Sequence, residues 1–354
     1  MKKITGPSFF IGQTGNGLIS FGSGQPDLPP PKQIYKILSS HNSYKYGLVQ
    51  GQIYLRQALA KQYPGSTADN FVITNGASEA LDLSLRALYV KGGKILLPRP
   101  YYYSYPHNVV LAGMKPVYYD LENGKINFKK FKKQIVGCRA VLINSPSNPT
   151  GTVQDLATLK QVEKLARQLN IYIISDEVYK DLIYERNNYL IKGSNVLTLN
   201  SFSKTYGMCG YRIGYVYARE QWLVDKIVEI KTHASMNTNI LGQEMALEAT
   251  KVNGGTIEKQ RQIWEGRRDY IYQGLKDLGL DLWKPEGAFY VFPKMKNPNK
   301  VVNDLYYKYK VVVYDGAWFG DPGRVRFSYA LDLAKIEEGL SRLGKYLKRE
   351  YRCN

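Results

Sequence analysis

Apolar positions along the chain form short, nearly continuous runs that alternate with longer amphipathic stretches. The strand-like runs are 71–74, 94–97, 140–143, 171–174 and 195–200. Their continuous apolar character is typical of strands that are buried on both faces. Two of the intervening stretches, 75–90 and 155–169, repeat apolar residues at helical spacing. This alternation predicts an α/β fold in which a mainly parallel sheet lies between helices.

The pattern changes near residue 282. Helices are expected at 221–232, 239–249 and 257–278, whereas the chain after Pro285 carries short strands and lysine-rich helices. A short strand also begins at Ile19 and breaks into a turn at Gly24. We therefore predict three segments. Residues 1–45 and 282–354 form the two parts of a small α+β domain, and residues 46–281 form a large domain.

Composition narrows the class of protein. With 354 residues, of which 44% are hydrophobic, the chain can bury a large core. It has no apolar run near the roughly 20 residues of a membrane span, and no apolar segment follows the basic N-terminus. These features favour a cytoplasmic protein without a membrane anchor. Cys138, Cys209 and Cys353 are far apart, so we expect reduced thiols and no metal site.

The formal net charge of +19 has two interpretations. It could attract a polyanion such as a nucleic acid, or it could simply keep the surface soluble. The basic residues are scattered, and no dense cluster with interleaved aromatic residues is visible. We therefore expect no nucleic-acid partner. A nucleic-acid-binding protein built on an inactive enzyme fold remains the more remote alternative, which salt-dependent binding would support.

The candidate chemistry centres on the stretch 201–214, which follows one strand-like run and leads into another expected at 212–217. Lys204 lies just after the first strand, where burial would favour the neutral amine. A neutral lysine can form a Schiff base with an aldehyde. Ser201, Ser203 and Arg212 add two hydroxyl groups and a cation, which suit a phosphate ester. An aldehyde and a phosphate on one ligand describe pyridoxal 5′-phosphate (PLP).

Two further groups follow strand ends. Asp176 comes two positions after the run 171–174, at a strand end where a carboxylate can pair with the pyridine nitrogen of PLP and keep it protonated. Glu177 is the rival carboxylate, but it is expected to point elsewhere. Gly76, Ala77 and Ser78 open a helix, and their N–H groups would hold the phosphate opposite the arginine. An ordinary strand-to-helix turn would have the same local sequence.

The serine-x-serine-lysine stretch at 201–204 and the glycine-x-arginine-x-glycine stretch at 210–214 resemble the cofactor-lysine signature of class I/II aminotransferases (fold type I). Motifs from Gly24 to Ala330 keep the family's order, and the chain looks most like the aspartate/aromatic aminotransferase branch. The resemblance implies PLP as cofactor, a homodimer, and a large PLP-binding domain joined to a small domain from both termini. It also implies ping-pong transfer of an amino group from an L-amino acid to a 2-oxo acid.

The resemblance assigns further roles. Tyr102 would stack on the cofactor ring and, with Lys204 and Asp176, form the catalytic set. Asn148 would donate to the cofactor's phenolic oxygen, where Tyr179 could also reach. A different group would bind the substrate α-carboxylate. It consists of Arg326, Asn148 and Gly24.

Two assignments have local competitors. Tyr46 matches a tyrosine that reaches the phosphate of the neighbouring subunit, while Tyr44 competes with it at a less suitable spacing. We expect a strand at 324–330 that carries Arg324 and Arg326 on the same face. Arg324 competes for the carboxylate role, but it could instead form an ordinary ion pair.

Departures from the family pattern bear on the substrate. The segment before Gly24 is short, and Ser78 occupies a place where some relatives acting on acidic substrates have lysine. Tyr101 and Tyr103 are expected near the site and favour an aromatic or broadly apolar amino acid. A PLP-dependent lyase or decarboxylase would use the same lysine and aspartate and remains the alternative. Measuring keto acid formation against ammonia or carbon dioxide release separates them.

Overall fold

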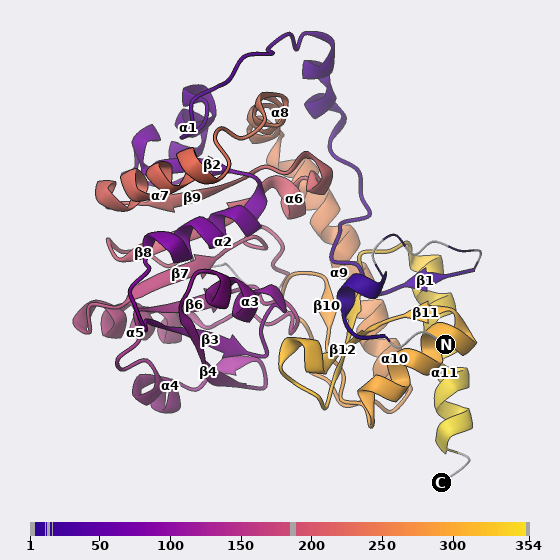
Figure 1. Ribbon diagram of the computed structural model, residues 1–354. Coiled ribbons are helices and arrows are strands. Elements are labelled where there is room, and N and C mark those ends of the chain that lie inside the picture. The colour runs from indigo at the N-terminus through magenta and orange to yellow at the C-terminus, as the bar shows by residue number, and fades with distance from the viewer. Residues whose placement is uncertain (1–3, 11, 13–14, 16, 185–188, 352–354) are drawn as a thin grey trace.

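The computed structural model describes residues 4–10, 12, 15, 17–184 and 189–351. Figure 1 shows two lobes. The larger lobe holds a wide sheet flanked by helices, and the smaller one contains both ends of the described chain. The long helix α9 (Gly254–Asp277) runs between them.

Within the described residues, eight strands form the main sheet of the large lobe. In spatial order they are β2 (Phe71–Thr74), β9 (Gly214–Ala218), β8 (Val196–Ser201), β7 (Tyr172–Asp176), β6 (Ala140–Asn144), β3 (Lys94–Arg99), β4 (Lys115–Glu122) and β5 (Lys125–Ile126). The five strands from β8 to β4 are mutually parallel, whereas β9 is antiparallel to both of its neighbours and β5 to β4. The predicted mainly parallel sheet is confirmed.

Helices cover both faces of this sheet. They are α1 (Ile53–Ala60), α2 (Gly76–Ala87), α3 (Ser104–Leu111), α4 (Phe128–Gln134), α5 (Leu156–Gln168), α6 (Phe202–Thr205), α7 (Gln221–Ala234) and α8 (Ile240–Thr250). In strand β6 the residues from Ala140 to Ile143 are all apolar because both faces of the strand are buried. Leu142 packs in the core beneath α2, α3 and α7, while Val141 and Ile143 pack in the core beneath α4 and α5.

The small lobe combines segments that are distant in sequence. Its strands are β1 (Ile19–Ser20), β10 (Tyr290–Val291), β11 (Val311–Val312), β12 (Tyr314–Asp315) and β13 (Val325–Ser328), and its helices are α10 (Pro298–Tyr309) and α11 (Leu333–Tyr351). Strand β1 pairs with β11, so the N-terminal segment joins the C-terminal part as expected. However, Trp264 and Ile271 of α9 pack in the small-lobe core. The division at 45/46 and 281/282 remains a prediction.

Short 3-10 helices occupy several connections: η1 (Pro7–Phe10), η2 (Lys32–Ser39), η3 (Ala68–Asn70), η4 (Cys209–Tyr211) and η5 (Gly316–Phe319). The strand expected at 212–217 begins only at Gly214, so its predicted start is wrong. Arg212 instead follows η4 in a left-handed turn with φ of 56°, where its side chain donates to the carbonyl oxygens of Cys209 and Asn75. No helix in the described parts of the chain is long and apolar enough to cross a membrane.

Candidate active site

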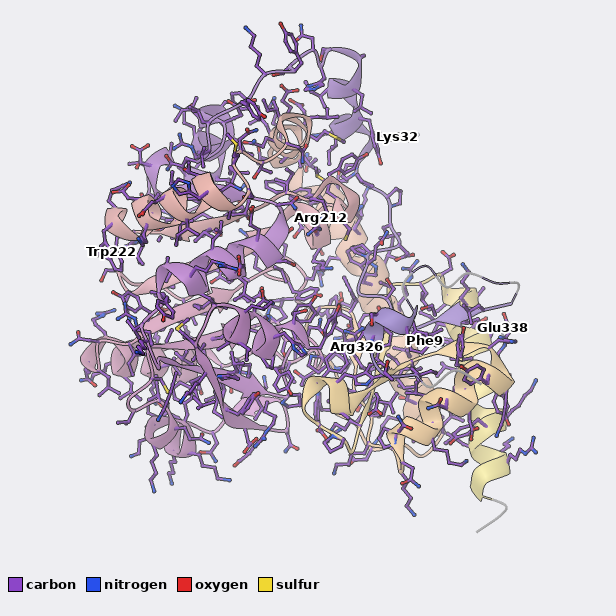
Figure 2. All side chains as sticks on the ribbon, in the orientation of Figure 1. Phe9, Lys32, Arg212, Trp222, Arg326 and Glu338 are labelled. Carbon is purple, nitrogen blue, oxygen red and sulfur yellow. The ribbon has the colours of Figure 1, made fainter. Side chains whose placement is uncertain are left out.

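A cavity of about 440 Å³ opens at the carboxyl ends of β6, β7 and β8, where the two lobes meet. Open α/β sheets bind ligands at this edge. Most of the residues that the sequence singled out line the cavity: Gly24, Ala77, Ser78, Tyr102, Asn148, Asp176, Tyr179, Ser201, Ser203, Lys204, Arg212 and Arg326. Figure 2 shows Arg326 where the lobes adjoin and Arg212 in the large lobe. The structure therefore gathers residues from both lobes around one space.

The phosphate site, as we call it here, comprises the first turn of α2 with Ser201, Ser203 and Arg212. Helix α2 has no side-chain cap, so its first N–H groups are available to a ligand. Gly76 has φ of 75°, and a Cβ atom there would lie 2.5 Å from Nη2 of Arg212. The hydroxyls of Ser201 and Ser203 lie 2.8 Å apart. A small residue is therefore needed for the arginine to approach the helix start and complete an anion site.

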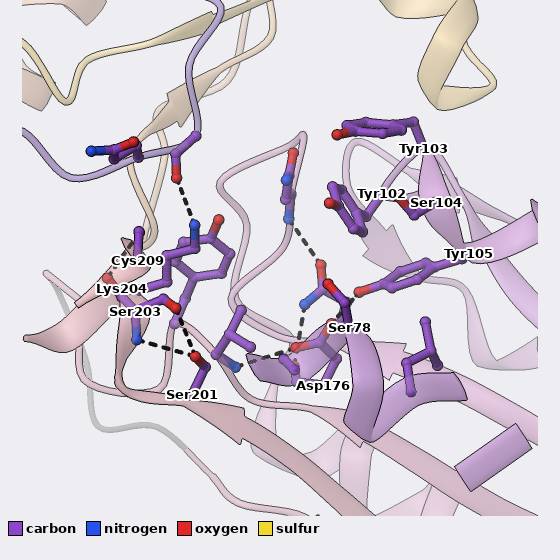
Figure 3. A pocket seen from close by; sticks show the side chains of 18 of the residues that line it. Ser78, Tyr102, Tyr103, Ser104, Tyr105, Asp176, Ser201, Ser203, Lys204 and Cys209 are labelled. Atoms are coloured by element: carbon purple, nitrogen blue, oxygen red, sulfur yellow. Dashed lines mark hydrogen bonds between the residues drawn. The ribbon is translucent and has the colours of Figure 1, made fainter. Parts of the chain in front are cut away.

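Lys204 lies in the cavity on the short helix α6, directly after β8. Its Nζ donates to the carbonyl oxygen of Gly24 at 2.6 Å (Figure 3). Burial lowers the pKa of the lysine, and repulsion from Arg326 and Arg212 lowers it further, although Cys209 acts in the opposite direction. A lowered pKa favours the neutral amine that reacts with an aldehyde.

Asp176 ends strand β7 and faces the cavity, whereas Glu177 does not line it. The hydroxyl of Tyr105 donates to Oδ2 of Asp176 at 2.6 Å. Burial raises the pKa of this aspartate, while the tyrosine bond lowers it. Glu177 instead accepts from the hydroxyl of Ser175 at 2.8 Å, and burial raises its pKa to about 7. The two adjacent carboxyls thus have different surroundings.

Arg326 enters the cavity from strand β13 of the small lobe. Its side chain is buried, and Nη1 donates to Oδ1 of Asn148 at 2.9 Å. The guanidinium carbon lies 4.5 Å from the ring centroid of Tyr290 and 4.8 Å from that of Tyr314. Its Nε has no hydrogen-bond partner within the described part of the chain. A buried cation with donors to spare suits a carboxylate ligand.

Arg324, the competitor of Arg326, and Tyr101, which was expected near the site, do not line the cavity. Arg324 does form an ion pair, with Asp321. Arg324 lies 4.1 Å from the ring centroid of Trp283 and donates to a backbone carbonyl outside the cavity. Tyr103 lines the cavity, but the expectation for Tyr101 is wrong. The Tyr101 ring instead stacks on Tyr118 of strand β4, with 5.5 Å between the ring centroids.

Tyr46 does not line the cavity of its own chain, and its side chain is 84% exposed. Tyr44 is exposed to a similar extent, at 88%. Both lie in the segment between η2 and α1 that protrudes from the large lobe in Figure 1. Neither side chain can therefore contribute to the site within one chain, and the choice between them remains a prediction.

Sequence reasoning missed several lining residues. Tyr105 was not singled out, although it lies three positions after Tyr102, at the start of α3, and lines the same cavity. The hydroxyl of Tyr290 lies 2.7 Å from that of Tyr179, 111 positions away in sequence. Spacing along α3 could have indicated the first residue. No local signal could have indicated Tyr290.

The residues present fit PLP. The phosphate site provides donors and a cation, Lys204 provides an amine of lowered pKa, and Asp176 provides a carboxylate for a ring nitrogen. Arg212 lies against Gly76 at the start of α2, so its cation and the first N–H groups of that helix lie beside one another. Among the described residues, no group of three or more histidine, cysteine, aspartate or glutamate side chains could hold a metal ion.

Comparisons with known proteins agree with this geometry. The family model "Aminotransferase class I and II" matches residues 16–343. Aromatic-amino-acid aminotransferase 2 of Thermococcus litoralis is 32% identical over 97% of this chain and 95% of its own length. The aspartate aminotransferase of Bacillus sp. (strain YM-2) is 30% identical over 94% and 92%.

Solved structures are similar across the whole chain. The aspartate aminotransferase of Thermotoga maritima superposes with a TM-score of 0.90, at 30% identity and with 97% of this chain and 95% of that chain covered. The aromatic aminotransferase of Pyrococcus horikoshii gives the same TM-score and identity, with coverage of 98% and 99%. The chain therefore belongs to the class I and II aminotransferases and is a PLP-dependent transaminase of fold type I.

Proposed function

We propose that the enzyme takes its amino group from aromatic or other uncharged L-amino acids and passes it to a 2-oxo acid. One observation carries this proposal. Among the described residues that line the cavity, the cationic side chains are Lys204, Arg212 and Arg326. Each has a role with the cofactor or with the α-carboxylate, so this chain's own lining residues leave no cation for a second substrate carboxylate. The walls around Arg326 are instead the rings of Tyr103, Tyr290 and Tyr314.

We assign the cofactor side as follows. When bound, PLP supplies an aldehyde for the substrate amine and an electron-withdrawing ring that stabilises negative charge at the substrate α-carbon. Arg212 and the start of α2 would hold the phosphate, Asp176 would face the ring nitrogen, and Tyr102 would lie against the ring. Asn148 and Tyr179 would contact the phenolic oxygen.

The remaining residues act on the substrate. Arg326 would bind the α-carboxylate, with Asn148 and the backbone near Gly24 alongside. This contact orients the α-carbon toward Lys204, whose neutral Nζ would take the α-proton and later return a proton at the other end of the transfer.

The test is a panel of donors in single half-reactions, in which conversion of the bound cofactor to its amine form is followed by absorbance. We expect kcat/KM for phenylalanine to exceed that for aspartate by at least about tenfold, since a buried carboxylate without a cation is costly. Faster reaction with aspartate would contradict the proposal. Tyr103→Ala should narrow the difference, whereas Tyr101→Ala, outside the cavity, should not. Release of carbon dioxide or ammonia in place of keto acid would indicate the lyase or decarboxylase alternative.

We further propose a cytoplasmic homodimer without a nucleic-acid partner. Large apolar side chains are exposed on one stretch of the large lobe: Leu38, Tyr44, Tyr46, Leu48 and Ile53. A second copy would cover this surface and receive Tyr46 at its phosphate site. Sedimentation should give a dimer, and Tyr46→Phe should weaken PLP binding more than Tyr44→Phe. A monomer with full activity would exclude the dimer and the role of Tyr46.

A further inference from the structure

Tyr105 is the side chain in closest contact with the carboxylate of Asp176. It lies in the first turn of α3 and is only 2% exposed. Its hydroxyl donates to Oδ2 at 2.6 Å, and Figure 3 shows the phenol pointing at the carboxylate from the side of Tyr102. The ring is fixed edge-on against Tyr102, 5.4 Å between centroids. The direction of this donor is therefore determined by packing.

Few other groups support the charge of Asp176. The backbone N–H of Val178 donates to Oδ1 at 3.3 Å, a longer bond. Asn144 donates to the backbone oxygen of Asp176 and not to its carboxylate. Lys204 attracts the charge from a distance, but its Nζ bonds to Gly24, and the nearby carboxyl of Glu177 is of like sign. Within the described residues, the phenol is thus the carboxylate's one side-chain hydrogen-bond donor.

We propose that Tyr105 is a positioning residue that keeps the Asp176 carboxylate anionic and oriented toward the pyridine nitrogen of PLP. The inference rests on the proposed role of Asp176. A hydrogen bond to a buried carboxylate stabilises its charged form. The tyrosine can donate over the whole working pH range, because burial and the neighbouring carboxylate raise its own pKa well above the usual value.

The consequence concerns where one proton resides. An anionic aspartate leaves the shared proton on the ring nitrogen, where it increases electron withdrawal. Without the phenol the carboxyl becomes more basic, and the proton moves from nitrogen to oxygen. A ring that carries less positive charge repels a further proton less strongly, so the bound cofactor takes up that proton at a higher pH. The pH midpoint of the cofactor's visible absorbance change should therefore rise.

The experiment compares Tyr105→Phe with Tyr119→Phe in the PLP-loaded enzyme. Tyr119 is a matched control, because it is also 2% exposed and its hydroxyl donates only to the carbonyl of Leu142, at 3.1 Å. In Tyr105→Phe we expect the absorbance midpoint to rise by about one pH unit and the half-reaction rate to fall about tenfold or more. Both quantities should stay at wild-type values in Tyr119→Phe. Equal midpoints in the wild type and Tyr105→Phe would overturn the inference.

A double variant and a fluorinated tyrosine test whether the effect of Tyr105 passes through Asp176. In an Asp176→Asn background, Tyr105→Phe should no longer move the midpoint, because the effect passes through the carboxylate. If Asp176→Asn leaves the absorbance unchanged, the proposed role of Asp176 is wrong. If Asp176→Asn changes the absorbance and Tyr105→Phe does not, only the inference on Tyr105 is wrong. Should Tyr105→Phe not fold, Tyr105→3-fluorotyrosine keeps the shape with a more acidic phenol. Its midpoint should move downward, and an unchanged or higher midpoint would overturn the inference.

Discussion

The two sides of the cavity are built in different ways. On the cofactor side, Asp176 and Ser201 are the last residues of the adjacent parallel strands β7 and β8, and Lys204 follows three positions later. On the substrate side, Arg326 comes from a small-lobe strand and donates to Asn148 of the large lobe and to the backbone oxygen of Gly22 near the N-terminus, at 2.5 Å. Sheet register positions the first group. Contact between lobes positions the second.

Because the two sides are built differently, substitutions on them should have different kinetic effects. A change on the cofactor side alters the chemistry, because the buried sheet holds its partners in place and cannot adjust. A change on the substrate side alters binding, because its residues meet only when segments from both ends of the chain and from the large lobe come together. Substitutions on the cofactor side should therefore mainly lower kcat, and those on the substrate side should mainly raise KM.

Lys204→Ala should have the largest effect. It removes the proton-transferring amine from the cofactor side, so the half-reaction rate should fall by about 10⁴-fold or more. Stopped-flow absorbance with phenylalanine as donor measures this rate, and Lys226→Ala on the exposed face of α7 is the control. Activity within tenfold of the wild type would show that Lys204 is not the catalytic base.

Arg326→Gln tests the substrate side. Removing the buried cation should raise KM and lower kcat/KM by about 10²- to 10³-fold, the effect of breaking a hydrogen-bonded charge pair. The affinity for PLP should change little. Arg324→Gln is the control: Arg324 lies just before β13, two positions from Arg326, and its guanidinium lies over the Trp283 ring outside the cavity. If Arg324→Gln raises KM as much as Arg326→Gln does, the assignment of the carboxylate site is wrong.

Arg212→Gln should have a smaller effect, on cofactor affinity. The helix start and the two serines would still bind the phosphate, so the Kd for PLP should rise by about ten- to a hundredfold. Saturating PLP should then restore most of the rate, as titration followed by activity would show. Failure to recover at any PLP concentration would mean that the arginine acts in the reaction itself.

The same division explains what could be predicted from sequence. The cofactor side follows from strand ends and a local motif, so Lys204, Asp176 and Arg212 could be predicted as one group, and they line one cavity. The substrate side depends on which distant segments meet. Arg326 was identified only through family resemblance, and Tyr290 was missed altogether because nothing near it in sequence indicates its contact with Tyr179.

On the cofactor side, the sequence did not reveal the direction of two tyrosine side chains, Tyr101 and Tyr105. Tyr105 was not singled out, because an apolar, buried position in a tyrosine-rich stretch does not reveal that its hydroxyl meets a carboxylate. Tyr101 was expected at the site because it is adjacent to Tyr102 in sequence. Successive side chains point in different directions, and Tyr101 stacks on Tyr118 of the neighbouring strand instead.

The smallest effect should appear in the pH dependence of the cofactor-free protein. Burial lowers the pKa of Lys204 below its usual 10.5, so the unfolded chain binds this proton more tightly than the folded one. The free energy of unfolding should therefore rise with pH between the lowered pKa and 10.5, and this contribution should be constant below and above that window. Denaturant titrations of the wild type and Lys204→Met give the contribution as a difference, because methionine has similar shape and no charge.

The rate of PLP association provides an independent measure of the same proton. Only the neutral amine attacks the aldehyde, so the rate should increase with pH and level off below 10.5, earlier than for a free lysine side chain. Arg326→Gln should move that midpoint upward, since repulsion from this arginine contributes to the lowered pKa. Such a shift would show that the substrate side, although built separately, sets the charge of the cofactor lysine. An unchanged midpoint would mean that the two sides act independently and that burial and the cofactor-side Arg212 lower the pKa of the amine without Arg326.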